Sequence, residues 1–160
     1  GIDSTYDVYE FVFTNMHPQS DAKFAFQFDV GTDTDYDQTI TSTLFYAWHK
    51  EDDSSAGLGY DGGNDQAQGT AYQPFASEIV ESSDADSSIS GILTLYGPSS
   101  DTYVKHFMGV SSYFQQDPGL QNVYVAGYVN TTTALTRISF KFESGNIDTG
   151  VIKMYGIAKS

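Results

Sequence analysis

Cysteine is absent from this chain of 160 residues. Its absence excludes disulfide scaffolds, thiolate zinc sites, iron–sulfur clusters and cysteine nucleophiles. Long apolar runs are lacking too: none exceeds a few residues, whereas a membrane-spanning helix needs about 20. Hydrophobic residues still make up 39% of the chain and aromatic residues 15%. That is enough apolar material for one core, so we expect a single domain over residues 1–160.

Basic residues are also scarce: 7 Lys and Arg stand against 21 Asp and Glu, for a net charge of −14. Such a surface repels phosphate backbones and anionic lipids, so we expect neither nucleic acid nor membrane as a partner. Most of the acidic residues lie between Asp29 and Asp86. This segment has two interpretations, solvated acidic loops that maintain solubility or a site for divalent cations.

The first residues do not have the pattern expected of an uncleaved signal peptide. The chain opens GIDST, without a methionine, a basic segment or an apolar segment of the kind found in signal peptides. Two explanations stay open. The N-terminus was processed, or the chain is the C-terminal part of a longer protein.

Alternation of apolar and polar residues recurs along the chain, whereas helical periodicity hardly occurs. In 23–30 the residues Phe24, Phe26 and Phe28 alternate with polar or small residues, and 136–143 follows the same rule. Each pattern predicts a strand with one apolar and one wet face. Further strands are predicted at 6–14, 39–49, 71–80, 89–96, 102–110, 123–130 and 150–157. These eight or nine strands predict an antiparallel β-sandwich that is jelly-roll-like.

Two polar stretches, 50–70 and 81–88, are predicted to be long acidic loops. A short internal similarity links 90–97 (SGILTLYG) with 149–156 (TGVIKMYG). It predicts two equivalent strands in opposed sheets. The alternative is that strands beginning with Gly and ending with Tyr simply resemble one another.

Catalytic motifs are missing. No GxSxG, P-loop, GxGxxG or HExxH pattern occurs, and His17, His49 and His106 have no ligand spacing. Two facing carboxylates on a sandwich could hydrolyse glycans. The candidates on predicted strands are Asp7, Glu10, Asp29, Glu78 and Glu143. Their positions alternate with the predicted core and favour solvated faces, so we do not expect an enzyme.

A calcium site is one alternative for the acidic run after Gly31. Asp33, Asp35 and Asp37 stand at every second position, and such spacing can wrap oxygen ligands around Ca²⁺. The run is not an EF-hand, because Gln38 and Leu44 occupy the positions where that loop needs Gly and Glu. An irregular calcium site and a solvated turn both fit. No other cofactor is expected.

Tyrosine is abundant, with 12 residues. Exposed tyrosines can stack on sugar rings, and tyrosine is also enriched where subunits meet. The residues proposed for glycan or subunit contact are Tyr60, Tyr72, Tyr124 and Tyr128.

Two motifs stand near the ends of the chain. Residues 6–18 follow the form YxxYxFxFxNxHP, and residues 144–157 follow the form SGNxxxGxIKLYGI, with Met154 in place of Leu. In this order, the two motifs resemble the opening and the ending of structural proteins of marine tailed phages. The resemblance implies a tail-fibre or tail-spike domain, or a capsid decoration or fibre protein, on the outer surface of the virion. Such domains are commonly jelly-roll-like homotrimers that contact other virion proteins, and some bind host-surface glycans.

Three hypotheses follow. The first is a non-enzymatic virion surface protein that assembles as a homo-oligomer, a trimer in the expected case. The second is a carbohydrate-binding β-sandwich with calcium and exposed aromatic residues. The third is a small jelly-roll hydrolase or lyase acting on glycans.

Overall fold

The computed structural model describes residues 1–32, 34–115 and 117–158. These residues contain no helix, and thus none that could cross a membrane. They form 11 strands, all paired antiparallel. The strands are β1 (Val8–Pro18), β2 (Phe24–Val30), β3 (Ile40–Lys50), β4 (Ala56–Tyr60), β5 (Ala67–Gly69), β6 (Gln73–Pro74), β7 (Ile89–Tyr96), β8 (Lys105–Phe114), β9 (Gly119–Val129), β10 (Leu135–Phe142) and β11 (Ile147–Ile157).

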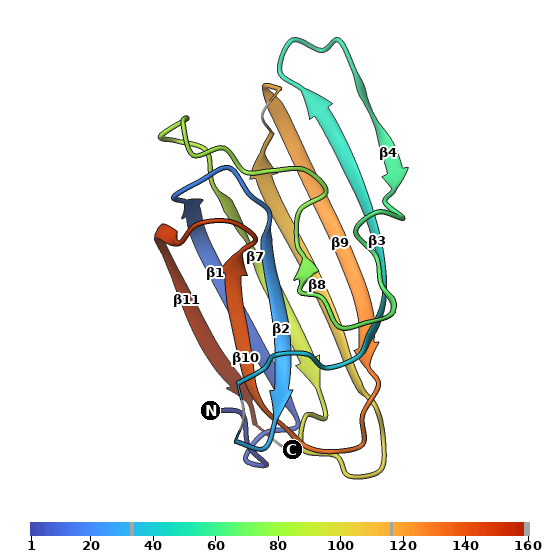
Figure 1. The fold of residues 1–160 in the computed structure, drawn as a ribbon. Helices are drawn as coiled ribbons and strands as arrows, with labels where there is room; N and C mark the ends of the chain where they lie inside the picture. The colour runs from blue at the N-terminus through green and yellow to red at the C-terminus, as the bar shows by residue number, and fades with distance from the viewer. Residues whose placement is uncertain (33, 116, 159–160) are drawn as a thin grey trace.

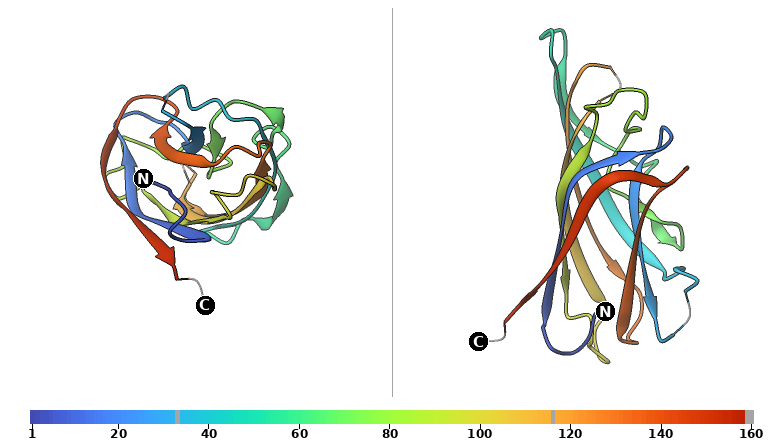
Figure 2. Two further views of the ribbon diagram at one scale, coloured as in Figure 1. Left: turned by 90° about the horizontal axis from the view of Figure 1, so that it is seen from below. Right: turned by 90° about the vertical axis from the view of Figure 1, so that its left-hand side faces the viewer.

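Two sheets pack face to face, which confirms the predicted antiparallel β-sandwich (Figure 1). The large sheet has eight strands in the order β11-β1-β7-β8-β9-β3-β4, with β5 also pairing with β3. The small sheet has three strands in the order β10-β2-β6. A regular jelly roll builds its two sheets from eight strands in two Greek keys, so the division here is more unequal. The small sheet covers only part of the large one, and β3, β4 and the start of β9 extend beyond it (Figures 1 and 2).

The core lies between the sheets and is built largely from phenylalanine. Phe24, Phe26 and Phe28 of β2 are fully buried and face the large sheet, as the alternation predicts. Phe75 lies at the centre, with its ring centroid 4.6 Å from that of Phe26 and 4.8 Å from that of Phe13. Burying each such side chain contributes about 1.5–3 kcal/mol, so this cluster holds the sheets together.

The other face of β2 is also buried, so the wet face predicted for 23–30 is wrong. Ala25, Gln27 and Asp29 are all inaccessible to solvent. The amide nitrogen of Gln27 donates to the backbone oxygens of Gln38, Thr70 and Ala71 at 2.9–3.1 Å. Loops from elsewhere in the chain therefore cover this face, and their carbonyl groups satisfy the polar side chains beneath them.

The predicted loop at 50–70 contains two strands, β4 and β5, and that prediction is corrected here. Glycine is rare in β-strands, so the sequence of β4 does not predict a strand. In the structure Gly57 and Gly59 pair with Trp48 and Tyr46 of β3, whose rings occupy the space that a Cβ would take. The segment 81–88, by contrast, lies between strands, as predicted.

The similar segments 90–97 and 149–156 belong to β7 and β11, which flank β1 in the same sheet. The prediction that they lie in opposed sheets is therefore wrong. Both strands run antiparallel to β1, and Phe11 of β1 pairs with Leu93 on one side and Met154 on the other. Leu93 is buried whereas Met154 is 47% exposed, because β11 forms the edge of the sheet.

Candidate functional site

The outer face of the large sheet, turned away from the core, is unusually free of charge. In the strands β7, β8 and β9 the outward positions contain no Asp, Glu, Lys or Arg. Interface cores are depleted of charged residues in the same way. The outward residues are Ser90, Ile92, Thr94 and Tyr96 of β7, His106, Met108, Val110, Ser112 and Phe114 of β8, and Leu120, Asn122, Tyr124, Ala126 and Tyr128 of β9.

An apolar row crosses this face at a right angle to the strands. The strand register places its members opposite one another, one on each of six neighbouring strands. Val110, Tyr124 and Phe45 at its centre are 41–47% exposed, and the rings of Tyr124 and Phe45 stack at 5.1 Å. We call this set the apolar row: Val12, Ile92, Val110, Tyr124, Phe45 and Tyr60.

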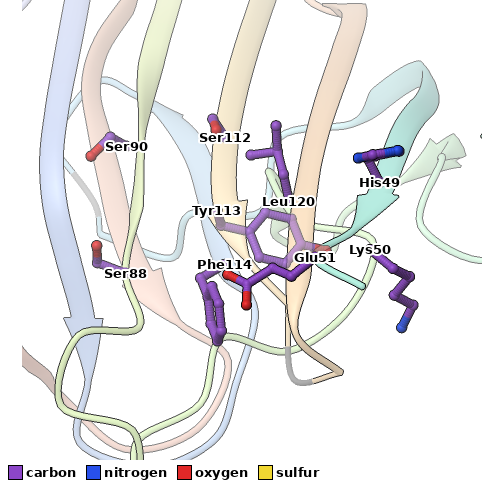
Figure 3. A pocket seen from close by; sticks show the side chains of 10 residues that line it. His49, Lys50, Glu51, Ser88, Ser90, Ser112, Tyr113, Phe114 and Leu120 are labelled. Carbon is purple, nitrogen blue, oxygen red and sulfur yellow. The ribbon is translucent and has the colours of Figure 1, made fainter. Parts of the chain in front are cut away.

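Two shallow hollows lie along the same face and share Ser90 and Ser112. One measures ≈ 470 Å³ and is lined by members of the apolar row together with Tyr96 and Met108. The other measures ≈ 500 Å³ and lies toward the end of β3, where Figure 3 shows Leu120, His49 and Glu51 around it. Together the two hollows make this face uneven, and a protein surface of complementary shape can fit into them.

The structure places three of the four singled-out tyrosines on this face. Tyr60 and Tyr124 belong to the apolar row, and Tyr128 lies beside His106 with a ring distance of 6.2 Å. Tyr72 lies elsewhere. Its hydroxyl donates to Ser139 Oγ at 3.1 Å, and the Lys141 ammonium lies 4.0 Å from its ring.

The acidic turn at 29–37 is described only in part, since Asp33 lies outside the described residues. Asp35 and Asp37 are exposed, in a segment without regular secondary structure. Among residues 1–32, 34–115 and 117–158, no three of His, Asp and Glu gather as a metal site would require. The calcium hypothesis therefore stays a prediction.

The carboxylates considered for catalysis are spread over separate elements. Glu10 lies on the outer face in β1, and Glu78 follows β6. Glu143 follows β10 and is exposed. Asp29 is buried and accepts the backbone N–H of Val30 at 2.8 Å. Asp29 therefore has a structural role at the end of β2.

A second candidate site lies on the inner face of the large sheet, where the small sheet no longer covers it. We call it the inner hollow; it measures ≈ 230 Å³ and is lined by Tyr46, Trp48, Lys50, Glu78, Gln115 and Gln121. Tyr46 and Trp48 are half-buried neighbours on one face of β3, with ring centroids 5.6 Å apart. The sequence signal for this pair is the alternation Tyr-x-Trp followed by Gly-x-Gly, but the alternation alone does not show that the two motifs pair.

A hydrogen-bonded network holds the polar side of the inner hollow. The buried hydroxyl of Tyr113 donates to Gln121 Oε1 and accepts the backbone N–H of Glu78 at 2.9 Å. The amide nitrogen of Gln115 donates to Glu78 Oε2 at 2.7 Å. Burial raises the pKa of Tyr113 well above its ordinary value, so this hydroxyl keeps its proton and remains a donor.

Comparison with known proteins adds no relative: no protein-family model, curated protein or solved structure matches this chain.

Proposed function

We propose that this protein is a non-enzymatic structural protein of the outer surface of a phage particle, a tail-fibre or spike domain or a capsid decoration protein, that assembles as a homo-oligomer. The observation that carries the assembly is the outer face of β7, β8 and β9, which bears no charged residue and is crossed by the apolar row, in a chain whose net charge is −14. The resemblance of both chain ends to virion proteins supports the place of this assembly on a particle.

The area of the outer face suits a subunit contact. A standard interface takes about 800 Å² from each partner. Strands about 30 Å long and ~4.8 Å apart present roughly 700 Å² of sheet when five of them, β1, β7, β8, β9 and β3, are counted. This area, which counts apolar and polar residues together, is close to the standard size for one partner.

The free edge of the large sheet is a second apolar feature. Among the described residues β11 pairs with β1 alone, and its residues Val151, Met154, Tyr155 and Ile157 are about half exposed. An exposed edge strand with apolar side chains is a template for pairing with another chain. Proteins usually protect such an edge, so a covering subunit is consistent with the proposed assembly.

The solution mass tests the proposal. We expect light scattering after size exclusion to give a multiple of the 17.5 kDa chain, with three copies as the case that the resemblance favours. Val110→Asp places a charge at the centre of the apolar row and should give the monomer with an unchanged circular dichroism spectrum. Tyr103→Asp is the matched control, since Tyr103 is exposed but lies in the turn before β8.

A wild-type monomer at all concentrations, or an oligomer that survives Val110→Asp, would contradict assembly through the outer face. Repeating the measurement with EDTA tests the calcium prediction, because loss of the oligomer would direct attention to Asp33, Asp35 and Asp37.

A further inference from the structure

The inner hollow combines ring surfaces with one buried polar atom, Gln115 Oε1, that has no hydrogen-bond partner among the residues that the structure describes. Tyr46 and Trp48 rest on Gly59 and Gly57 of β4, where an added Cβ would lie 2.8 Å and 2.6 Å from the rings. The backbone of β4 thus supports the rings. Because both residues are half-buried and also line the inner hollow, they present ring surface to it as well.

The side-chain oxygen of Gln115 is a hydrogen-bond acceptor to which a ligand can donate. Gln115 is only 5% exposed, and its Oε1 is buried without a hydrogen-bond partner among the described residues. An unsatisfied buried acceptor destabilises a fold, so such an atom usually has a bound donor. Gln115 lines the inner hollow, and a donor lodged there could supply that bond.

The neighbouring groups define which ligand would fit. Glu78 offers a carboxylate acceptor. Gln121 accepts from Tyr113 with its oxygen, which leaves its amide NH₂ group as a donor. A ligand suited to this site has hydroxyl groups that both donate and accept, beside an apolar face that stacks on aromatic rings. A pyranose sugar has both properties.

The charges around the inner hollow favour neutral sugars over anionic sugars as ligands. The Glu78 carboxylate and the net charge of −14 repel an anionic sugar. Lys50 is the one cation that lines the inner hollow, and its ammonium is already bound to the Asp117 carboxylate. The volume of ≈ 230 Å³ is below the ~300–1,000 Å³ of sites for drug-sized ligands, so one sugar ring would be held and the remainder would lie in solvent.

We propose that the inner hollow binds one neutral pyranose unit of a glycan, stacked on Tyr46 and Trp48 and hydrogen-bonded by Glu78, Gln115 and Gln121. The site does not depend on the proposed assembly, because it opens on the opposite face of the large sheet from the apolar row.

Tryptophan fluorescence can test the proposal directly, since Trp48 is the single tryptophan of the chain. Titration of the full chain with glucose, galactose, mannose and N-acetylglucosamine should give, for at least one sugar, a saturable change in emission below about 100 mM. Glycerol at matched concentration is the solvent control. N-acetylneuraminic acid is the anionic control and should not bind.

Two variants separate binding from folding. Glu78→Ala removes the carboxylate but keeps the backbone N–H that holds Tyr113, so the fold should persist while the affinity falls at least about tenfold. Glu143→Ala removes an exposed carboxylate after β10 and should bind as the wild type does.

Three outcomes would overturn the proposal. In the first, no neutral sugar changes the Trp48 emission more than glycerol does. In the second, only the anionic sugar binds saturably, and in the third, Glu78→Ala and Glu143→Ala lose affinity equally. The first would mean that the inner hollow holds solvent only. None of these results depends on the solution mass, so the assembly proposal can fail or succeed separately.

Discussion

At the scale of single residues, the polar side chains that hold loops in place are as decisive as the phenylalanine core. Asp61 joins β4 to the turn that follows it. Its carboxylate accepts hydrogen bonds from the Ser77 hydroxyl, from Asn64 Nδ2 at 2.6 Å and from the Gly63 N–H at 3.0 Å. Asn64 in turn accepts a bond from the Lys23 ammonium at 2.7 Å. These bonds attach the glycine-rich turn to both sheets.

Removing this carboxylate should loosen the turn. Burial alone would raise the pKa of Asp61, but the hydrogen bonds from Ser77, Asn64 and Gly63 outweigh burial and hold its pKa below the ordinary value. We expect Asp61→Ala to lower the free energy of unfolding by about 1–3 kcal/mol near neutral pH, as measured by urea denaturation. Asp148→Ala, an exposed carboxylate of β11, should have little effect.

The stability difference between wild type and Asp61→Ala depends on pH in a way that follows from the direction of the Asp61 pKa shift. A carboxyl group whose pKa is lowered on folding stabilises the native state above its unfolded pKa, and the contribution is lost as the pH falls through the lowered value. The difference between wild type and Asp61→Ala should therefore shrink as the pH falls below the ordinary pKa of an aspartate, about 3.9. A difference that stays constant at acid pH would contradict the assigned role of the charge.

At the scale of secondary-structure elements, the exposed β3–β4 hairpin depends on side chains that cross from one strand to the next. Glycines 57 and 59 weaken β4, and the rings of Trp48 and Tyr46 compensate by covering them. The same arrangement builds one wall of the inner hollow. The strand β4, which the sequence predicts as part of a loop, thus forms the edge of the sheet and supports the candidate sugar site.

Replacing one of these glycines tests the arrangement. In Gly57→Ala the new Cβ would lie 2.6 Å and 2.7 Å from two ring carbons of Trp48, so the ring must move. We expect the emission of Trp48 to shift to longer wavelength and the free energy of unfolding to fall by about 1–3 kcal/mol. In the control Gly62→Ala the Cβ has only an ordinary contact at 3.8 Å with Tyr60. Equal behaviour of the two variants would show that the rings do not rest on β4.

At the scale of the whole molecule, two features oppose each other: the net charge of −14, and the outer face of β7, β8 and β9, which bears no charged residue. Copies that meet through this face bring together apolar side chains while their acidic loops repel. The hydrophobic contribution is not weakened by salt, whereas repulsion between exposed charges is screened within about 10 Å at 0.1 M ionic strength.

Assembly should therefore strengthen with salt. Raising sodium chloride from about 0.05 M to about 0.5 M is expected to lower the dissociation constant of the oligomer several-fold, as measured by sedimentation. The variant Val110→Asp should remain monomeric at both concentrations. An oligomer that dissociates as salt is added would instead indicate contacts made by pairs of opposite charges.

The sequence by itself determined the fold class, because alternation with period two directly reports which side chains face a core. Eight of the predicted strands correspond to β1, β2, β3, β7, β8, β9, β10 and β11. It also excluded thiol chemistry and placed Tyr60, Tyr124 and Tyr128 among candidate contact residues.

Tertiary structure alone decided what these elements build. Loops distant in the chain cover Gln27, and β1 separates the similar strands β7 and β11. The apolar row depends on the register of six strands, and the inner hollow on where the small sheet ends. Register and coverage arise from contacts between residues far apart in sequence, and the local pattern of a strand does not contain that information.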